Sequence, residues 1–541
     1  MEELTGRRKA GTDRGGADPN SLTDGALRAI LITLCAALAL VVAGNSALAI
    51  ALPDIADDLG ADQSELTWII DAYAVTFAAL LLTAGLAADK LGRRSVLVVG
   101  LAVFGAASVA SAFAPDPGWL IALRGISGIG AAAIFPVTLS ALVDAYPPER
   151  RTFAIAVWSG VSSAGAVAGT IVAGVLLEAF WWGSVQLLFG GVAVLLIVPA
   201  LVLVAQRRDR SLSADLPAAV WSILALGGIV FAIIEGPQRG WDDPLTIGTM
   251  ALGVVGLIGF IVHQLRARTP SLDVRLFRNR GLAAGSLIVT VQFFASLGLF
   301  VLAPQYLQLV EEFTPLGAAL ALLVLPIGVG AGIGASVALA KRFGQRAPGS
   351  LGLLLMGAGF ATCAWGLTEA ADATIWVLAA GLVVYGVGFG MGITPGTELI
   401  IEGLPAERRS IASAVNDITR EVGGVLGIAI LSSILLDVYR DDIAPSIASL
   451  PAAAREIVDS GAAAAIGAAE AFGPAGAAVA DAAREAFAAG FSAALWVGAV
   501  LLAVAGVACA AIAPGRSTGS TASGPTPTGA VEQEAGGEVA P

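Results

Sequence analysis

Residues 147–169 read PPERRTFAIAVWSGVSSAGAVAG, and residues 405–427 read PAERRSIASAVNDITREVGGVLG, a diverged copy 258 positions later. A second pair of segments, AADKLGRR at 87–94 and LAKRFGQR at 339–346, repeats at an offset of 252. Glycine-rich membrane helices resemble one another by composition alone, but the shared Pro-x-Glu-Arg-Arg lies in a loop, where composition imposes no such likeness. Two repeats at nearly one offset therefore indicate a chain made of two similar halves.

The composition indicates a membrane protein. Of the 541 residues 57% are hydrophobic and only 13% are charged, whereas soluble proteins carry about 25% charged residues. A helix needs about 20 apolar residues to cross a bilayer. We find fourteen such runs, at 28–51, 66–88, 95–114, 119–143, 152–177, 184–205, 216–235, 245–265, 282–309, 316–340, 349–368, 374–397, 409–435 and 488–512. The predicted fold class is an all-α polytopic membrane protein.

The distribution of Lys and Arg predicts which side of the membrane each loop faces, because cytoplasmic loops carry the excess of positive charge. With both termini inside, 24 basic residues fall on inner segments and four on outer ones. A miscounted helix would invert part of this pattern, so the split supports fourteen spans. We expect disordered cytoplasmic tails at 1–27 and 513–541. Abundant Ala and Gly, with Arg preferred over Lys, suggest a bacterial inner-membrane protein.

Eight helices separate the two copies, so equivalent helices run in the same direction. The predicted organisation is a six-helix bundle at 28–210, two inserted helices with a linker at 211–280, and a second six-helix bundle at 281–512. We expect the inserted pair, 216–265, to pack peripherally. Segment 437–487 is too charged to span and is broken by Gly473-Pro474, which predicts an external helical hairpin. Parallel six-helix repeats around a central site are typical of rocking transporters.

Several other functional classes lack support. The net charge of -12 comes with no basic face for nucleic acid, and no Gly-x-x-x-x-Gly-Lys-[Ser/Thr] phosphate loop occurs. Cys35, Cys363 and Cys509 fall singly in separate spans, which disfavours a disulfide framework or a thiolate metal site. The only histidine, His263, lies at a helix end among arginines. We therefore expect no catalytic residues, no metal site and no cofactor.

Ionisable residues inside the spans are the strongest functional signal, since each costs several kcal/mol in a bilayer and persists only where it faces protein or water. Asp71 has no local partner, and Arg124 at similar depth would stabilise its charged form if the two approach. Asp417, Arg420 and Glu421 share one helix face by their spacing. A structural ion pair is the alternative reading of this triad. A carboxylate that holds either a proton or a cation gives competition at one site, the simplest device for antiport.

Polar and aromatic residues at intermediate depth are candidates for lining a cavity that accepts a lipophilic compound. Their depth along the spans is the basis of this prediction. They are Asn45, Tyr73, Gln292, Phe293, Phe294, Tyr306 and Tyr385.

Over nearly its whole length the chain resembles the major facilitator superfamily, specifically its fourteen-helix drug:proton antiporter branch. GLAADKLGRR (85–94) is similar to the superfamily's loop signature, and WIIDAY, AVNDITREVGGVLG, APQYLQ and WWGSV are similar to the QacA-like subgroup. The resemblance implies a 6+2+6 arrangement of two pseudo-symmetric bundles. It implies a role in proton transfer for Arg124 and a role in transport for Asp71. It also implies a cytoplasmic gate formed by Gly85, Asp89, Gly92, Arg93 and Arg94.

Some positions depart from the family's pattern. The first span reads Gly44-Asn45-Ser46 where relatives commonly have Asp-Thr-Thr. The glycine motif of the fifth span, here Gly165, Gly169 and Gly174, lacks the usual proline. The direction of transport, the number of protons and the acceptance of dications depend on these positions.

We expect a monomeric, proton-driven exporter of lipophilic, cationic drugs or toxic compounds that works by alternating access in the lipid bilayer. Its partners would be the small substrate and protons, with the proton gradient as the energy source. A dedicated exporter of an endogenous metabolite and an uptake carrier are alternatives on the same fold. A non-transporting membrane sensor is a further alternative from another class.

Overall fold

The computed structural model describes residues 23–207, 215–267, 270, 272–369, 374–404, 410–469 and 476–514. The first half of the chain forms α1 (Asp24–Ile50), α2 (Leu52–Leu59), α3 (Gln63–Leu91), α4 (Arg93–Ser111), α5 (Pro117–Ala145), α6 (Pro148–Leu177) and α7 (Gly183–Leu203). Two inserted helices follow, α8 (Leu216–Arg239) and α9 (Pro244–Arg266), and then the short 3₁₀ helix η1 (Val274–Arg278). The second half forms α10 (Arg280–Leu309), α11 (Pro315–Ala321), α12 (Val324–Phe343), α13 (Arg346–Glu369), α14 (Thr374–Glu402), α15 (Ser410–Ile447), α16 (Ala452–Asp459), α17 (Ala462–Gly467) and α18 (Gly476–Ile512).

Fourteen helical segments within the described ranges are long and apolar enough to cross a membrane, which confirms the predicted count. Helices are the natural solution there, because main-chain polar groups in lipid must be satisfied within the segment itself. The predicted span at 316–340 consists of two pieces, α11 and α12, which are separated by a turn at Leu322 and Leu323. The chain is therefore an all-α polytopic protein with a 6+2+6 arrangement.

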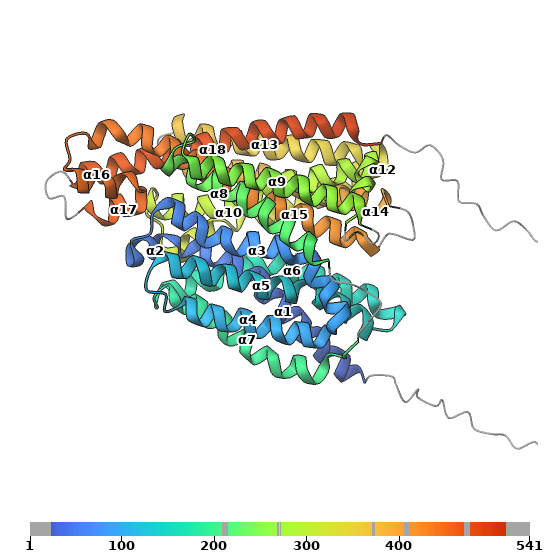
Figure 1. The fold of residues 1–541 in the computed structure, drawn as a ribbon. Coiled ribbons are helices and arrows are strands. Elements are labelled where there is room, and N and C mark those ends of the chain that lie inside the picture. Colours follow the sequence, from blue (N-terminus) through green and yellow to red (C-terminus); the bar gives the residue numbers. More distant parts are fainter. Residues whose placement is uncertain are drawn as a thin grey trace, which may run out of the picture.

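The helices gather into two bundles, one from each half (Figure 1, blue to teal and yellow to red). We call the end at which α3 passes into α4 the loop end. The opposite end, which carries α2, α16 and α17, is the hairpin end. The first turn of α1 lies at the loop end, because Tyr146 at the end of α5 donates a hydrogen bond to the carbonyl of Leu27. The last turn of α18 also lies there, because Arg280 at the start of α10 donates a hydrogen bond to the carbonyl of Ile512.

A pair of equivalent contacts demonstrates the pseudo-symmetry of the halves. At the loop end of the first bundle, Arg93 donates a short hydrogen bond to Asp144. At the loop end of the second bundle, Gln345 donates a short hydrogen bond to Glu398. The donors lie 252 positions apart, the offset of the loop repeat, and the acceptors lie 254 apart. The contact is ionic in the first half and has a neutral donor in the second.

Two predicted segments differ from the structure in their bounds or their composition. Helix α1 begins at Asp24, because the Thr23 side chain caps it, so part of the predicted tail 1–27 is helical. The predicted hairpin 437–487 is built from extensions of α15 and α18 with α16 and α17 between them. Residues 1–22, 405–409, 473–474 and 515–541, which carry parts of the predicted tails, the repeat and the hairpin break, lie outside the described ranges.

The inserted pair is peripheral only in part. Helix α9 packs on α8 and exposes the apolar side chains of its other face, as the prediction requires. Helix α8, however, packs against α3 of the first bundle and α15 of the second. The prediction of a peripheral pair is therefore wrong for α8, which lies along the line where the two bundles meet (Figure 1).

Candidate functional site

Asp71 is the most deeply buried carboxylate of the spans. Its exposed fraction is 0%, and neither carboxylate oxygen has a hydrogen-bond partner among the residues that the structure describes. The 3.6-residue helical period places Asp71 on the same face of α3 as Ser64, Val75 and Ala78. A buried anion without a partner is very unfavourable, so this surrounding accommodates the neutral, protonated acid.

An apolar cluster packs beside Asp71 where three helices meet. Its members are Ala74, Val75 and Ala78 of α3, Val230 and Ile234 of α8, and Val425 and Ala429 of α15; we call it the seam cluster. Because α3 belongs to one bundle and α15 to the other, the seam cluster lies between the two halves. Asp71 lies one helical turn from Val75, on the side toward the hairpin end.

Arg124 of α5 does not pair with Asp71. Its guanidinium donates to the carbonyl of Ile69 (3.0 Å), the carbonyl of Gly44 (3.4 Å) and the side-chain oxygen of Asn45 (3.4 Å). It also lies over the ring of Tyr73, 4.4 Å from the centroid. Tyr73 follows Asp71 by two residues, about 200° around the helix, so it points to the opposite side of α3. Arg124 is therefore fully buried in the first bundle and ties α5 to α1 and α3.

The three charged residues of α15 lie on the other side of the seam cluster. Glu421 precedes Val425 by one turn, toward the loop end, and it is partly exposed, as are Asp417 and Arg420. Arg420 lies over the ring of Phe293, 4.4 Å from the centroid. The acidic groups of the spans thus form two sites, with the seam cluster between them.

Most of the predicted cavity residues are buried inside one bundle. Tyr73 donates to the carbonyl of Val41, Tyr306 to Glu311, and Gln292 to the carbonyl of Phe389, while Tyr385 shares a hydrogen bond with Ser296. These four residues and Phe294 are at most 6% exposed. In this conformation these residues are held inside the bundles, and that they line a cavity stays a prediction. Asn45 and Phe293 are partly exposed.

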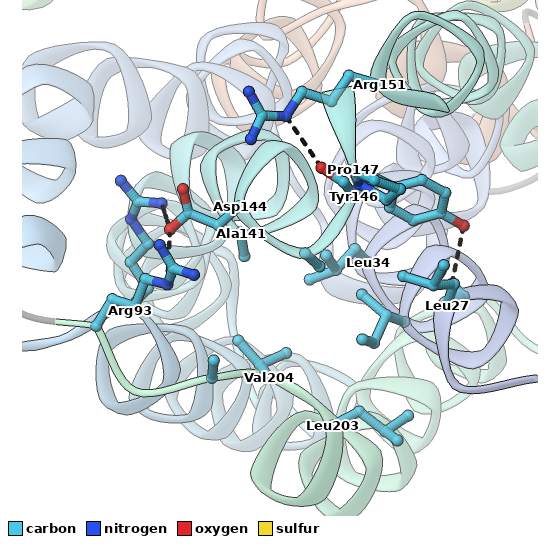
Figure 2. A pocket seen from close by; sticks show the side chains of 14 residues that line it. Leu27, Leu34, Arg93, Ala141, Asp144, Tyr146, Pro147, Arg151, Leu203 and Val204 are labelled. Atoms are coloured by element: carbon cyan, nitrogen blue, oxygen red, sulfur yellow. Dashed lines mark hydrogen bonds and ion pairs between the residues drawn. The ribbon is translucent and has the colours of Figure 1, made fainter. Parts of the chain in front are cut away.

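The predicted gate motif forms a chain of ionic contacts. Arg93 binds Asp89 at 3.1 Å and also binds Asp144, and Arg207 approaches Asp144 at 3.6 Å. Figure 2 shows Arg93 and Asp144 beside a cavity of about 410 Å³ at the loop end of the first bundle. All of these partners belong to the first bundle. In this conformation the motif therefore organises its own bundle.

The other motif residues differ in how strictly they are required. Gly92 has a φ of +108°, and a Cβ there would lie 2.2 Å from the side chain of Gln206, so glycine is needed. A Cβ on Gly85 would make only an ordinary contact with Pro136, at 3.7 Å. Arg94 donates to the carbonyl of Leu201 (3.3 Å).

The glycines of α6 allow close approach of neighbouring helices. A Cβ on Gly169 would lie 2.7 Å from the Cα of Ala43, and Gly165 also faces α1. Gly174 faces the second half, because a Cβ there would lie 3.0 Å from the Cα of Leu316. The first two glycines therefore pack helices within a bundle, whereas Gly174 packs the bundles together.

The two halves meet closely at the hairpin end. The side chain of Gln308 donates to the carbonyl of Ile50 (3.0 Å), and the main-chain amide of Gln63 donates to the carbonyl of Ser460 (2.9 Å). Gly174 adds its close contact there. The structure is therefore closed at the hairpin end.

Sequence reasoning missed several polar groups that the structure brings together. Asp144 and Glu398 were not predicted as site residues. They lie 254 positions apart, which nearly equals the 252-residue offset of the loop repeat and could have indicated them. Glu235 of α8 accepts a hydrogen bond from the indole of Trp68 at 2.9 Å. No local pattern indicated this contact, because it joins an inserted helix to a bundle.

Comparison with known proteins gives consistent results. Residues 34–428 match the family model described as Major Facilitator Superfamily. The chain is 33% identical to a multidrug efflux pump from Mycolicibacterium smegmatis, over 76% of this chain and 82% of that protein. It is 31% identical to a puromycin resistance protein from Streptomyces alboniger, over 75% and 81% of the two chains. It is 34% identical to a methyl viologen resistance protein from Salmonella typhimurium, over 71% and 78%.

Solved structures share the fold at low sequence identity. A bacterial homologue of the human lysosomal transporter Spinster, in an inward-facing conformation, gives a TM-score of 0.64 at 17% identity, covering 91% of this chain and 98% of that one. The Escherichia coli xylose transporter XylE in an inward-open conformation gives 0.54 at 14% identity, covering 90% and 97%.

Proposed function

The chain belongs to the Major Facilitator Superfamily, and from this we propose that it exports lipophilic, cationic compounds in exchange for protons. The similar proteins named for drug efflux or resistance support export of drugs or toxic compounds. The family is one of transporters, so the cargo leaves chemically unchanged. The proton gradient is the energy source, and no cofactor takes part.

The observation that carries proton coupling is the arrangement of the acidic groups. Asp71 is buried without a partner on one side of the seam cluster, and Glu421 is partly exposed on the other. A neutral acid suits the first site, whereas the second holds two acidic groups, Asp417 and Glu421, and one basic group, Arg420, an excess of negative charge that suits a cation. Because the seam cluster joins helices of different bundles, a relative movement of the bundles changes access to both sites.

The cycle follows from competition at Glu421. In the conformation closed at the hairpin end, a cation reaches the Glu421 carboxylate from the loop end. The bundles then rock so that the hairpin end opens, and a proton that enters there, first held by Asp71, displaces the cation from the Glu421 carboxylate. The proton leaves at the loop end once that end reopens. Exchange of one proton for one monovalent cation moves no net charge, so the pH gradient drives it, and each unit of pH difference supplies about 1.4 kcal/mol.

This direction requires the loop end to face the cytoplasm. The excess of basic residues on loop-end segments supports that orientation, which also places both termini inside. We propose the inner membrane of a bacterium as the location and a monomer as the working unit.

Proteoliposomes that contain the full chain and an internal pH-sensitive dye test this proposal. Methyl viologen and puromycin serve as probes, since similar proteins are named for resistance to them. We expect proton movement opposite to the movement of the probe, and none without protein. Probe movement without proton movement would overturn the coupling, and cotransport in one direction would favour an uptake carrier.

A dedicated exporter remains a second candidate, because some similar proteins carry the name of one compound and others are called multidrug proteins. Resistance of cells with and without the gene to a panel of unrelated lipophilic cations separates the two. Protection against several of them supports a multidrug exporter. Protection against one supports a dedicated exporter.

A further inference from the structure

Helix α8 is attached to both bundles at the hairpin end. Beyond its apolar contacts with α3 and α15, it has a polar anchor to each of them. Neither bundle needs α8 to complete its own six helices. The anchors therefore point to a task at the line where the bundles meet.

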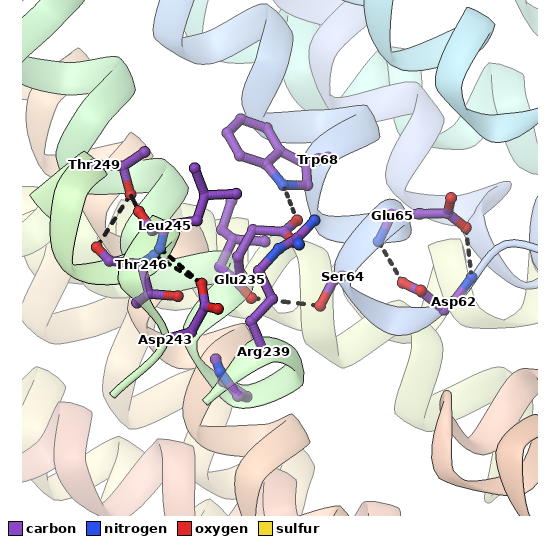
Figure 3. Close-up of polar contacts among 12 residues, drawn as sticks. Asp62, Ser64, Glu65, Trp68, Glu235, Arg239, Asp243, Leu245, Thr246 and Thr249 are labelled. Carbon is purple, nitrogen blue, oxygen red and sulfur yellow. Dashed lines mark hydrogen bonds and ion pairs between the residues drawn. The ribbon is translucent and has the colours of Figure 1, made fainter. Parts of the chain in front are cut away.

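The first anchor joins α8 to α3 (Figure 3). The indole N–H of Trp68 donates to Glu235 at 2.9 Å, and the Ser64 hydroxyl donates to the carbonyl of Ile234 at 3.4 Å. Arg239, one turn further along α8, binds the other oxygen of Glu235 at 2.7 Å and so orients this carboxylate. The rings of Trp68 and Phe231 lie 5.8 Å apart.

The second anchor joins α8 to α15. Arg440 donates a short hydrogen bond to the carbonyl of Pro237, in the last turn of α8. The last carbonyls of a helix lack partners within it and carry partial negative charge, so a guanidinium is a favourable partner. Arg440 also donates to the carbonyl of Asp459 at 3.1 Å, which fixes it to the hairpin segment of the second half.

Asp71 lies on the face of α3 that packs against α8. Ser64 and Asp71 share one face of α3, and Trp68 lies at the edge of that face. Val230 and Ile234 of α8 pack into the seam cluster beside Asp71. With α8 in place, Asp71 is fully buried although it lies only two turns from the hairpin end of α3.

We propose that α8 is a cover that shields Asp71 from water while the hairpin end is closed. Trp68, Glu235 and Arg440 are the positioning residues that hold the cover. When the bundles move apart at the hairpin end, α8 cannot follow both, so one anchor breaks and water reaches Asp71. That Asp71 carries a proton during transport rests on the proposed function, whereas the shielding of Asp71 by α8 is a property of the fold.

Reactivity of a cysteine at position 71 tests the cover without any cargo. The parent is the full chain in proteoliposomes, with Cys35, Cys363 and Cys509 replaced by Ala and Asp71→Cys introduced. The probe is a small water-soluble methanethiosulfonate reagent applied to both sides of the membrane. Trp68→Phe keeps the ring but removes the N–H, and Arg440→Gln removes the guanidinium. Trp221→Phe is the matched control, because Trp221 lies on α8 against Gly259 of α9, away from the anchors.

We expect Trp68→Phe and Arg440→Gln each to speed labelling at position 71 at least tenfold, with no change for Trp221→Phe and little change in melting temperature. Equal labelling rates in all four proteins would overturn the proposal. So would rapid labelling of the parent while the hairpin end is held closed by a cross-link between cysteines at Asp57 and Gly467, whose positions adjoin.

Proton flux in the chain with native Asp71 connects the cover to transport. Trp68→Phe should raise proton flux in the absence of cargo several-fold and leave the KM for cargo unchanged. Glu235→Gln keeps an oxygen that accepts from Trp68, so it should leak less than Glu235→Ala. Faster labelling combined with no proton flux in any variant would retain the cover and refute proton coupling. Unchanged labelling with normal coupled transport would refute the cover alone.

Discussion

Arg124 and Asp71 lie on opposite sides of α3, although Arg124 donates a hydrogen bond to the carbonyl of Ile69, only two residues before Asp71. The guanidinium of Arg124 therefore donates its hydrogen bonds to main-chain and amide oxygens of its own bundle. The acid is left in an apolar surrounding between the bundles. This separation assigns different tasks to the two residues and allows each to be tested alone.

Asp71→Asn should leave the protein folded and inserted, because the amide has the size and neutrality of the protonated acid. We expect proton-driven accumulation of cargo to fall to background while downhill exchange continues. Transport with and without a pH gradient measures this. Glu65→Gln, a carboxylate-to-amide change in the first turn of the same helix, is the control and should behave like the wild type. Normal export of every cargo by the Asp71 variant would make Asp71 structural.

Arg124→Lys should destabilise the protein, since the guanidinium of Arg124 donates to three separate acceptors through its planar group, and the single ammonium group of a lysine cannot replace it. Each buried acceptor left without a partner costs about 1–3 kcal/mol. We expect a lower melting temperature and an equal loss of transport for all cargoes. If stability is unchanged while proton coupling alone is lost, Arg124 acts in proton transfer, as the family resemblance implies.

Glu421→Gln should weaken the binding of cations selectively. We expect a tenfold or larger rise in Kd for a monocation, about 1.4 kcal/mol, and no change for a neutral compound of similar size. Equilibrium binding to the purified protein measures both. Glu402→Gln, at the exposed end of α14, is the matched control. An equal loss for charged and neutral compounds would assign Glu421 to packing.

Asp89→Asn should slow the cycle more than it weakens binding, because it removes a charge from the Asp89–Arg93–Asp144 chain and leaves the contact between Arg93 and Asp144 in place. We expect kcat to fall about tenfold with KM nearly constant, corresponding to about 1.4 kcal/mol. Initial rates over a range of cargo concentrations separate the two parameters. A raised KM with intact turnover would show that the gate assignment is wrong.

Gly174→Leu should favour the conformation that is open at the hairpin end, because its side chain would collide with Leu316. Spin labels at Asp57 and Glu456, exposed positions on opposite halves, should move apart. Gly160→Leu is the control, since a Cβ there meets no atom within 4 Å. An unchanged distance distribution in the Gly174 variant would contradict a sealing role for this glycine.

Sequence patterns predicted the large-scale architecture well, because each membrane span is recognised from one continuous apolar run and the two halves from short repeated motifs. The 252-residue offset between Arg93 and Gln345 anticipated equivalent positions that the structure confirms. The loss of helix in the middle of 316–340 was not foreseen, although Pro326 was available as a signal, because a proline cannot donate the main-chain hydrogen bond to Leu322 that a continuous helix requires.

The details of the site were less predictable, for a physical reason. Depth in a span follows from residue number, but the direction of a side chain depends on which helices surround it. Tyr306 and Tyr385 have suitable depth and yet are bonded inside the second bundle. The position of α8 and its contact between Glu235 and Trp68 depend on tertiary packing, which hydropathy does not encode.

The position of α8 also has a pharmacological consequence. Its contact surface with α3 is apolar at the level of the seam cluster, and α9 borders the surrounding lipid. A lipophilic molecule that wedged itself into this surface from the bilayer would act at a distance from the cargo, so raising the cargo concentration would not overcome the block. Inhibitors of this kind would need no likeness to any exported drug.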